Sequence, residues 1–455
     1  MLNQLSDAIN KYKKRVDYLE VRAEESEGTG IKFRGKEMES VSQPSSRGGC
    51  VRALYKGGWG FVSFNDLDKL ADKIEEAVSQ ARLVGRGKSR LAQVEPVEDE
   101  IRMIFRNDPR KISLKEKVDQ MRDYHDQIWA VSPLVSDASV VYSDSFSRVY
   151  FASSEGTKIV QEFSGITAGF SVVARKNGLL QSNAAAVFDK SDYSVVRTLG
   201  ARITQRVKLA VDLLEAEQVK SGQYTVVLNP VMAGNFIHEA FGHLSEADSV
   251  YENKKLRQIM RLGRRLGADG LNVVDDPTLE DGWGSYNYDD EGVRPQKTYL
   301  IREGILSGRM HSRETAGKMG EAPTGNARAA GFRFRPLVRM SNTFIEAGKV
   351  GFDEMLKDIK LGIYACNFWG GQTNQEMFTF TPGWAYMIRN GQLAELVRDV
   401  KLTGNVFETL GNIEMIGDDL GLRMEPGKCG KGGQYLRVDA GAPHVRIKNA
   451  TVAGK

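Results

Sequence analysis

The chain has few residues of the kinds that form covalent or metal cross-links, with three cysteines and five histidines among 455 residues. An odd number of cysteines without a C-x-x-C pair argues against a disulfide framework and favours a reducing compartment. No apolar run is long enough for a membrane span, so no membrane association is expected. The first residues, MLNQLSDAINKYKKR, are charged and lack the apolar core of a signal peptide. We therefore expect a cytoplasmic protein.

The sequence also lacks a strong excess of charge. The formal net charge is +4, with 41% hydrophobic and 27% charged residues, which is ordinary for a globular protein and too little charge to predict a nucleic-acid partner. One basic stretch, NKKLRQIMRLGRR at 253–265, has no aromatic residues for base stacking and lies between acidic segments. We interpret it as a solvated helix or exposed loop, which makes a nucleic-acid-associated regulator the weakest functional hypothesis.

Hydrophobic periodicity predicts an α+β fold in three parts. Leu19, Val21 and Ala23 alternate with charged residues as in a strand, and the apolar spacing over about 193–215 predicts a long helix. Between them the pattern indicates an antiparallel meander, and after the long helix short strands alternate with glycine-rich turns. The predicted units are an N-terminal α+β domain (1–85), a central α/β domain (101–218) and a β-rich C-terminal domain (222–455).

A short histidine motif stands near the start of the third unit. Tyr224–Leu228 is a β-branched run typical of a buried strand, and the Asn-Pro pair after it suits the cap and first turn of a helix. That helix would carry His238, Glu239 and His243. The pattern is H-E-x-x-x-H, one residue longer than the H-E-x-x-H of zinc peptidases.

The motif has the residue types that zinc hydrolysis needs. Two neutral imidazoles can bind Zn²⁺ and leave a position for water, whose pKa the metal lowers to about 7. Glu239 can take the proton of that water as a general base and pass it to a leaving amine. The alternative is two unrelated histidines on an amphipathic helix. It is weakened because two of the five histidines fall within this motif with a glutamate between them.

The spacing of the two histidines conflicts with a regular helix. Residues four apart lie about 40° apart around an ideal α-helix, whereas residues five apart lie about 140° apart. A π-bulge, which adds one residue to a turn, would realign His238 and His243. We predict an irregular helix between Glu239 and His243, with Gly242 as a suitable place for the distortion. A regular helix with the imidazoles pointing apart would contradict a zinc site.

The third zinc ligand must come from another part of the chain. Glu246 is the local candidate, and its alternative role is a carboxylate that orients a ligating imidazole. Asp248 is a weaker candidate for the same two roles. Spacing does not rank the remote candidates, although Cys429 has the most suggestive setting, GKCGKGGQ, and a thiolate is a strong zinc donor. Its alternative reading is an exposed loop thiol. The remote candidates are His311, His444, Cys366 and Cys429.

A set of ordered motifs makes the chain similar to a known family. From Asn229 to the C-terminus, and more weakly over nearly the whole chain, it resembles the TldD/PmbA family of zinc metalloproteases, in the catalytic TldD-like branch. The PmbA/TldE-like branch lacks the histidine motif. The motifs that carry the resemblance are HEAFGH (238–243), VVDDP (273–277), DDEGV (289–293), APTGNAR (322–328), RMSNTF (339–344), GGQ (370–372) and CGKGGQ (429–434).

The resemblance implies a site, a substrate and a partner. It implies Zn²⁺ bound by His238, His243 and Cys429, with Glu239 as the catalytic base, which leaves Glu246 as a residue that supports a ligand. It implies interleaved N-terminal and central α/β regions and a β-rich C-terminal region. It further implies hydrolysis of unfolded or extended peptides by a dimer, formed with a PmbA/TldE-like paralogue or with itself.

One further function class is compatible with the same residues. A non-catalytic peptide-binding or assembly subunit would use the metal site structurally. Four protein ligands and no water would favour that function, because catalytic zinc sites keep one position open.

Overall fold

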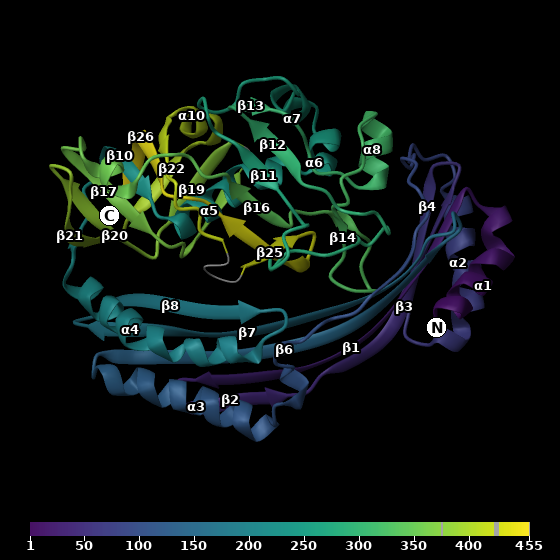
Figure 1. Ribbon diagram of the computed structural model, residues 1–455, viewed down its shortest axis with the longest axis horizontal. Coiled ribbons are helices and arrows are strands. Elements are labelled where there is room, and N and C mark those ends of the chain that lie inside the picture. The colour runs from purple at the N-terminus through teal and green to yellow at the C-terminus, as the bar shows by residue number, and fades with distance from the viewer. Residues whose placement is uncertain (375, 423–426, 455) are drawn as a thin grey trace.

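A long curved sheet runs along one side of the molecule, and the C-terminal region rests on it (Figure 1). The computed structural model describes residues 1–374, 376–422 and 427–454. The eight strands of this sheet are β1 (Tyr18–Arg34), β2 (Glu37–Ser42), β3 (Ser45–Tyr55), β4 (Gly58–Phe64), β5 (Glu98–Ile101), β6 (Val135–Ser153), β7 (Lys158–Lys176) and β8 (Leu179–Asp189). Their order is β4-β3-β1-β6-β7-β5, with β2 paired to β1 and β8 to β7.

The first two predicted units share this sheet. Strand β1, from the first unit, pairs antiparallel with β6, from the second, with Val21 opposite Ala152. Strands β6, β7 and β8 form the predicted antiparallel meander. The α+β class and the interleaving of the N-terminal and central regions are therefore confirmed, while the three unit boundaries remain a prediction.

One face of the sheet is buried under helices. The alternating residues Leu19, Val21 and Ala23 pack with the helices near the chain start, and Ile31 and Phe33, farther along β1, pack with the central pair. Both pairs cover the same side of the sheet (Figure 1). The period-two pattern thus buries odd positions at both ends of β1, whereas Glu25 and Glu27 in its middle are not buried. The helices are α1 (Leu2–Tyr12), α2 (Leu70–Leu83), α3 (Leu114–Val131) and α4 (Gly200–Glu215).

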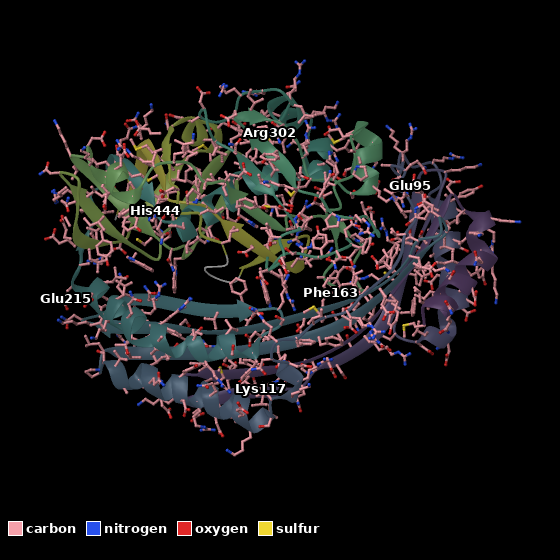
Figure 2. All side chains as sticks on the ribbon, in the orientation of Figure 1. Glu95, Lys117, Phe163, Glu215, Arg302 and His444 are labelled. Carbon is pink, nitrogen blue, oxygen red and sulfur yellow. The ribbon has the colours of Figure 1, made fainter. Side chains whose placement is uncertain are left out.

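The other face of the sheet carries charges that bind the C-terminal region. Arg22 on β1 pairs with Asp290 at 3.1 Å, and Arg52 on β3 pairs with Glu291 at 3.2 Å. In Figure 2, Phe163 lies on this side of the sheet and Lys117 on the helix-covered side. Because a buried charge without its partner is strongly destabilising, these pairs specify how the C-terminal region sits on the sheet.

The C-terminal region is built around a ten-stranded sheet. Its order is β18-β19-β22-β26-β10-β17-β20-β21-β9, with β23 paired to β26. Strand β10 lies inside the sheet, parallel to β17 and antiparallel to β26. The strands are β9 (Glu217–Gln218), β10 (Gly222–Leu228), β17 (Leu361–Cys366), β18 (Gly370–Asn374), β19 (Met377–Thr381), β20 (Trp384–Arg389), β21 (Gln392–Arg398), β22 (Lys401–Asn405), β23 (Ile413–Ile416) and β26 (Val445–Ala453).

A second sheet of six strands lies beside the first, in the order β13-β12-β11-β16-β25-β24. Helix α5 (Pro230–Ile237) follows β10 and packs against two strands of this second sheet, β16 and β25. Apart from Asn235, every residue of α5 is buried, so the helix is a core element. The strands are β11 (Val273–Asp275), β12 (Thr298–Arg302), β13 (Ile305–Leu306), β16 (Asn342–Ile345), β24 (Gly427–Lys431) and β25 (Gln434–Gly441).

Two segments for which a helix was considered are only partly α-helical in the structure. The prediction of one α-helix over 193–215 is wrong for the first turns. Tyr193–Thr198 is a 3-10 helix, and α4 begins only at Gly200. The side chain of Asp192 accepts a hydrogen bond from Ser194 N at 2.8 Å, which starts this tighter turn. In the basic stretch, only α7 (Lys254–Ile259) is helical before a loop. Within the described residues, no helix is long and apolar enough to cross a bilayer.

A buried carboxylate ties three of the motifs together behind α5. Asp275 is fully buried at the end of β11 and accepts hydrogen bonds from Ser341 N, Ser341 Oγ, Thr343 Oγ1 and Asn326 Nδ2, each at 2.8 Å. These donors come from the RMSNTF and APTGNAR motifs. A single acidic side chain therefore satisfies polar groups of two other segments and links them to its own.

We expect Asp275→Ala to destabilise the protein strongly. It leaves several buried donors without an acceptor, at about 1–3 kcal/mol for each. The free energy of unfolding from urea denaturation should fall by at least about 3 kcal/mol, whereas Asp353→Ala, an exposed carboxylate, should change it by less than about 1 kcal/mol. Equal stability of the two variants would show that the Asp275 network is not a stabilising element.

Candidate metal centre

The helix of the histidine motif changes its winding where the sequence predicts it. Asn229 caps α5 by accepting a hydrogen bond from Met232 N at 2.8 Å, and regular α-helix ends at Ile237. Residues 238–242 form a π-helical turn, followed by a 3-10 turn at 243–245. The predicted irregularity is confirmed. With one extra residue in the turn, the rings of His238 and His243 lie with their centroids 5.4 Å apart.

Gly242 permits this turn because of what packs against it. A Cβ atom at Gly242 would lie 2.1 Å from Met340 Sδ, far inside van der Waals contact. Met340 is itself fully buried. Any larger residue at position 242 would require either the buried Met340 side chain or the π-turn to shift.

Cys429 reaches the histidines from a hairpin. Strands β24 and β25 pair antiparallel with Cys429 opposite Leu436, and their connection is Gly432–Gly433, with φ of 57° and 75°. Positive φ at both positions is the requirement of a type I′ turn, which glycine meets without strain. Cys429 is only 4% exposed and lies in a strand, so the reading as an exposed loop thiol is wrong.

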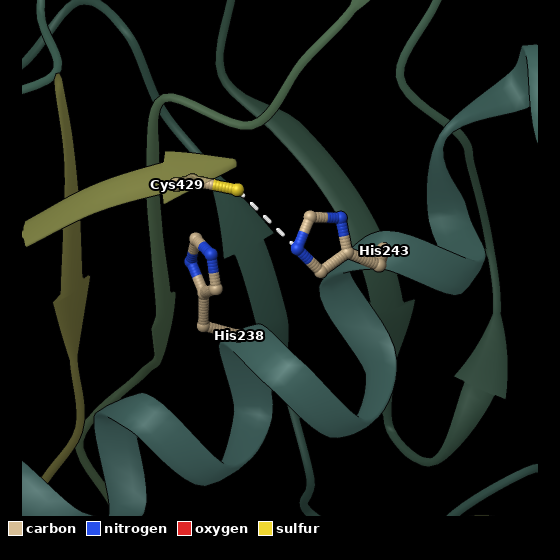
Figure 3. Close-up of side chains that lie close together, drawn as sticks. All are labelled: His238, His243 and Cys429. Carbon is tan, nitrogen blue, oxygen red and sulfur yellow. Dashed lines mark hydrogen bonds between the residues drawn. The ribbon is translucent and has the colours of Figure 1, made fainter. Parts of the chain in front are cut away.

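The two histidines and the cysteine converge (Figure 3). Cys429 Sγ lies 3.3 Å from His243 Nε2, and the three side chains offer ligand atoms that all lie within 4.8 Å of one another. Tetrahedral zinc with two nitrogens and one sulfur requires ligand separations of about 3.3–3.6 Å. The 3.3 Å between Cys429 Sγ and His243 Nε2 lies in that range, and two imidazoles with a thiolate are donors that zinc prefers, so the three residues fit a zinc ion.

The charges of the three side chains also suit a cation. Burial raises the pKa of the Cys429 thiol, but hydrogen bonds and the charges of His238 and His243 outweigh it and lower that pKa to about 5. Burial lowers the pKa of His243, yet its bonds to Cys429 and Glu246 raise it to about 10. Nδ1 of His238 is buried without a hydrogen-bond partner among the described residues. This environment favours positive charge between the three side chains.

Two carboxylates flank His243. Glu239 Oε2 lies 3.9 Å from His243 Nε2, and its side chain is 31% exposed. Glu246 Oε2 lies 3.1 Å from His243 Nδ1 and is 1% exposed. The helix does not continue through Glu246, which instead precedes α6 (Ala247–Glu252). Glu246 still makes a hydrogen bond with Nδ1 of His243, the ring nitrogen that faces away from Cys429.

The other ligand candidates lie with different partners. Asp248 Oδ1 is 2.7 Å from Lys431 Nζ, and Cys366 is a buried residue of β17. The two other candidate histidines have hydrogen-bond partners of their own. His311 contacts Thr315 and Glu321, and His444 contacts Tyr364 and Asp419. Sequence reasoning missed two residues: Arg339, which donates to carbonyls of the Cys429 hairpin, and Lys431, a hairpin residue of the CGKGGQ motif that contacts Glu246.

A cavity of the molecule is separate from these residues. It encloses about 690 Å³ between the eight-stranded sheet and the C-terminal region, and its described lining does not contain the motif histidines, Glu239 or Cys429. Its wall includes Lys428 and Tyr435, which flank Cys429 along the hairpin. Other lining residues are Gln161, Phe163, Trp283 and Tyr286.

Comparison with known proteins places the chain in a family. Three family models match in order: PmbA/TldA metallopeptidase domain 1 over 19–83, the central domain over 107–211 and the C-terminal domain over 221–454. A metalloprotease of Synechocystis sp. is 43% identical over 452 residues, covering 99% of this chain and 97% of the relative. The zinc metalloprotease TldD homologue of Saccharolobus solfataricus is 31% identical, covering 92% and 93%. The chain belongs to the TldD/PmbA metallopeptidase family.

Solved structures share the fold at lower identity. A putative modulator of a DNA gyrase from Thermotoga maritima superposes with a TM-score of 0.81 at 21% identity over all of both chains. TldE from Thermococcus kodakarensis superposes with a TM-score of 0.76 at 17% identity, covering 99% of this chain and 100% of that one. These similarities establish the architecture described above.

The three thiols should differ sharply in reactivity. In metal-free protein we expect iodoacetamide to label Cys429 at a rate that is nearly constant from pH 8 to pH 6 and falls as pH drops through about 5, because the thiolate reacts and the pKa of Cys429 is about 5. Burial raises the pKa of Cys50 and of Cys366 to about 12, so both should stay unlabelled. Peptide mass spectrometry distinguishes the sites. A rate for Cys429 that rises tenfold per pH unit from 6 to 8 would contradict this prediction.

Proposed function

We propose that the protein is a zinc-dependent peptidase that hydrolyses unfolded or extended peptides. The observation that carries the proposal is the convergence of His238, His243 and Cys429 beside the partly exposed carboxylate of Glu239. In this proposal the first three residues hold the metal and Glu239 is the catalytic base. The names of the metalloprotease relatives support the same reaction class.

Each side chain has a defined task in the proposed reaction. When bound, zinc would polarise the scissile carbonyl and lower the pKa of a water molecule to about 7. Glu239 takes a proton from the attacking water and later delivers it to the leaving nitrogen. Its partial exposure leaves room for a substrate, while Glu246 orients His243 by accepting a hydrogen bond from Nδ1 and so directs Nε2 to the metal.

An open sheet edge next to the π-turn suits an extended substrate. Strand β18 is the last strand of the ten-stranded sheet, and within the described part of the chain it pairs only with β19. Its Cα atoms approach those of residues 238–242 within 8 Å. A peptide that adds to this edge would be held mainly by backbone hydrogen bonds, which places few demands on its side chains.

The alternative function, a peptide-binding subunit with a structural metal, has less support. It requires a fourth protein ligand, and the described His, Cys, Asp and Glu residues supply a group of three. His243 is also 29% exposed, which leaves one side of the group open to solvent.

The proposal includes a partner and a compartment. We infer a dimer, formed with a PmbA/TldE-like paralogue or with a second copy, and the fold shared with TldE supports the paralogue. All three cysteines are free thiols, which supports a reducing, cytoplasmic setting.

The first test separates metal binding from catalysis. We expect Glu239→Gln to retain stoichiometric zinc, measured by elemental analysis, and to cleave an unstructured peptide about 10²–10⁴-fold more slowly, because the general base is lost. Cys429→Ala should lose both zinc and cleavage. Glu252→Gln, an exposed glutamate in nearby α6, is the control and should match the wild type. A wild-type protein that binds no zinc and cuts nothing, even with a paralogous partner added, would refute the peptidase proposal.

The second test addresses backbone recognition. Alanine replacement along a cleaved peptide should change kcat/KM only a few-fold at most positions. N-methylation of alternate backbone amides should lower it at least about tenfold, because each methyl removes a hydrogen bond to the sheet edge. Equal sensitivity to both kinds of change would favour side-chain pockets over strand addition.

A further inference from the structure

Lys431 joins two segments that are far apart in the sequence. It lies in β24, two residues after Cys429, and its ammonium contacts the segment that follows His243. Its Nζ lies 2.9 Å from Glu246 Oε2 and 2.7 Å from Asp248 Oδ1. A third hydrogen bond, of 3.1 Å, goes to the carbonyl of Val338 in β15 (Leu337–Val338).

All three hydrogen-bond donors of the Lys431 ammonium group therefore have an acceptor. A lysine has three N–H donors, and three acceptors from two parts of the fold surround this one. Its side chain is only 20% exposed, and Glu246 is almost completely buried, so water does not screen their contact strongly. Three bonds in three directions fix the position of the nitrogen, and with it the end of β24.

The other anchors of the hairpin do not reach the histidine segment. Arg339 donates to the carbonyls of Cys429 and Gln434. Arg437 donates to Ser164 O and Ser145 Oγ on the eight-stranded sheet. These bonds hold the hairpin to its own surroundings. Cys429 also contacts the histidine segment, through His243 Nε2 at 3.3 Å.

We propose that Lys431 is a positioning residue, which ties the strand of Cys429 to the segment of His243 and holds the thiol at metal-binding distance. The proposal rests on the zinc site proposed above. Its physical basis is that a metal binds more tightly when contacts around the ligands already hold them near their binding positions, because less ordering accompanies binding. Glu246 touches His243 Nδ1 and Lys431 Nζ together, so one carboxylate orients the imidazole and anchors the thiol strand.

The test compares Lys431→Met with Lys428→Met. Methionine keeps much of the length of the lysine and removes its charge and its donors. Lys428 lies on the same strand, is exposed and makes no ion pair with the described residues, which makes it the matched control. Circular dichroism and the thermal midpoint must first show that both variants are folded.

Two measurements follow, and one does not depend on the metal. In metal-free protein at pH 8, iodoacetamide should label Cys429 about tenfold faster in Lys431→Met than in the wild type, because the charged hydrogen bonds that keep the strand closed are gone. In competition with a chromophoric chelator, Lys431→Met should bind zinc about 10–100-fold more weakly. Lys428→Met should match the wild type in both. Asp248→Asn should shift both quantities in the same direction by less.

The two measurements also separate this proposal from the zinc proposal. If the wild type binds no zinc but Lys431→Met still exposes Cys429, the zinc site fails and the positioning role of Lys431 stands. If Lys431→Met labels Cys429 and binds zinc as the wild type does, the positioning role is overturned. Should Lys431→Met prove unfolded, Asp248→Asn decides, and its equality with the wild type in both measurements overturns the role.

Discussion

The structure of the site depends on one extra residue in one turn of helix. A five-residue separation places His238 and His243 on different sides of a regular helix, and only the π-turn over 238–242 brings them together. The turn is possible because Gly242 has no side chain where Met340 packs. Helix α5 cannot shift to relieve the distortion, because it is a buried core element that contacts the second sheet. The distortion is thus held in place by packing on both sides.

Local geometry made part of this predictable from the sequence. The angle between residues five apart requires an irregular helix at this motif, and the cap at Asn229 and the strand before it follow from residue preferences within a few positions. The interleaving of β1 with β6 was implied by the family resemblance alone. Spacing could not choose among four remote ligands, because the place of Cys429 depends on β25 pairing with β16, which brings together residues about a hundred positions apart.

The contacts that the sequence did not reveal are those between distant polar residues. The charged positions of β1 read as the solvent face of a strand, yet Arg22 pairs with Asp290 in the C-terminal region. In the sequence Asp275 is one acidic residue of a short motif, yet in the structure it accepts hydrogen bonds from two other motifs. In both cases the partner lies far along the chain, so no local pattern indicates it. Several of the motifs that carry the family resemblance therefore support the site without belonging to it.

The separation of the ligands along the chain has a consequence for folding. Cys429 follows His243 by 186 residues. A metal held by both would close a loop of that length, most of the C-terminal region, and could bind tightly only after the hairpin has docked beside the π-turn. Metal binding would then stabilise the folded region by mass action, in proportion to the logarithm of the free metal concentration. Zinc supply would thus control how long the C-terminal region persists in its folded form as well as whether the site can react.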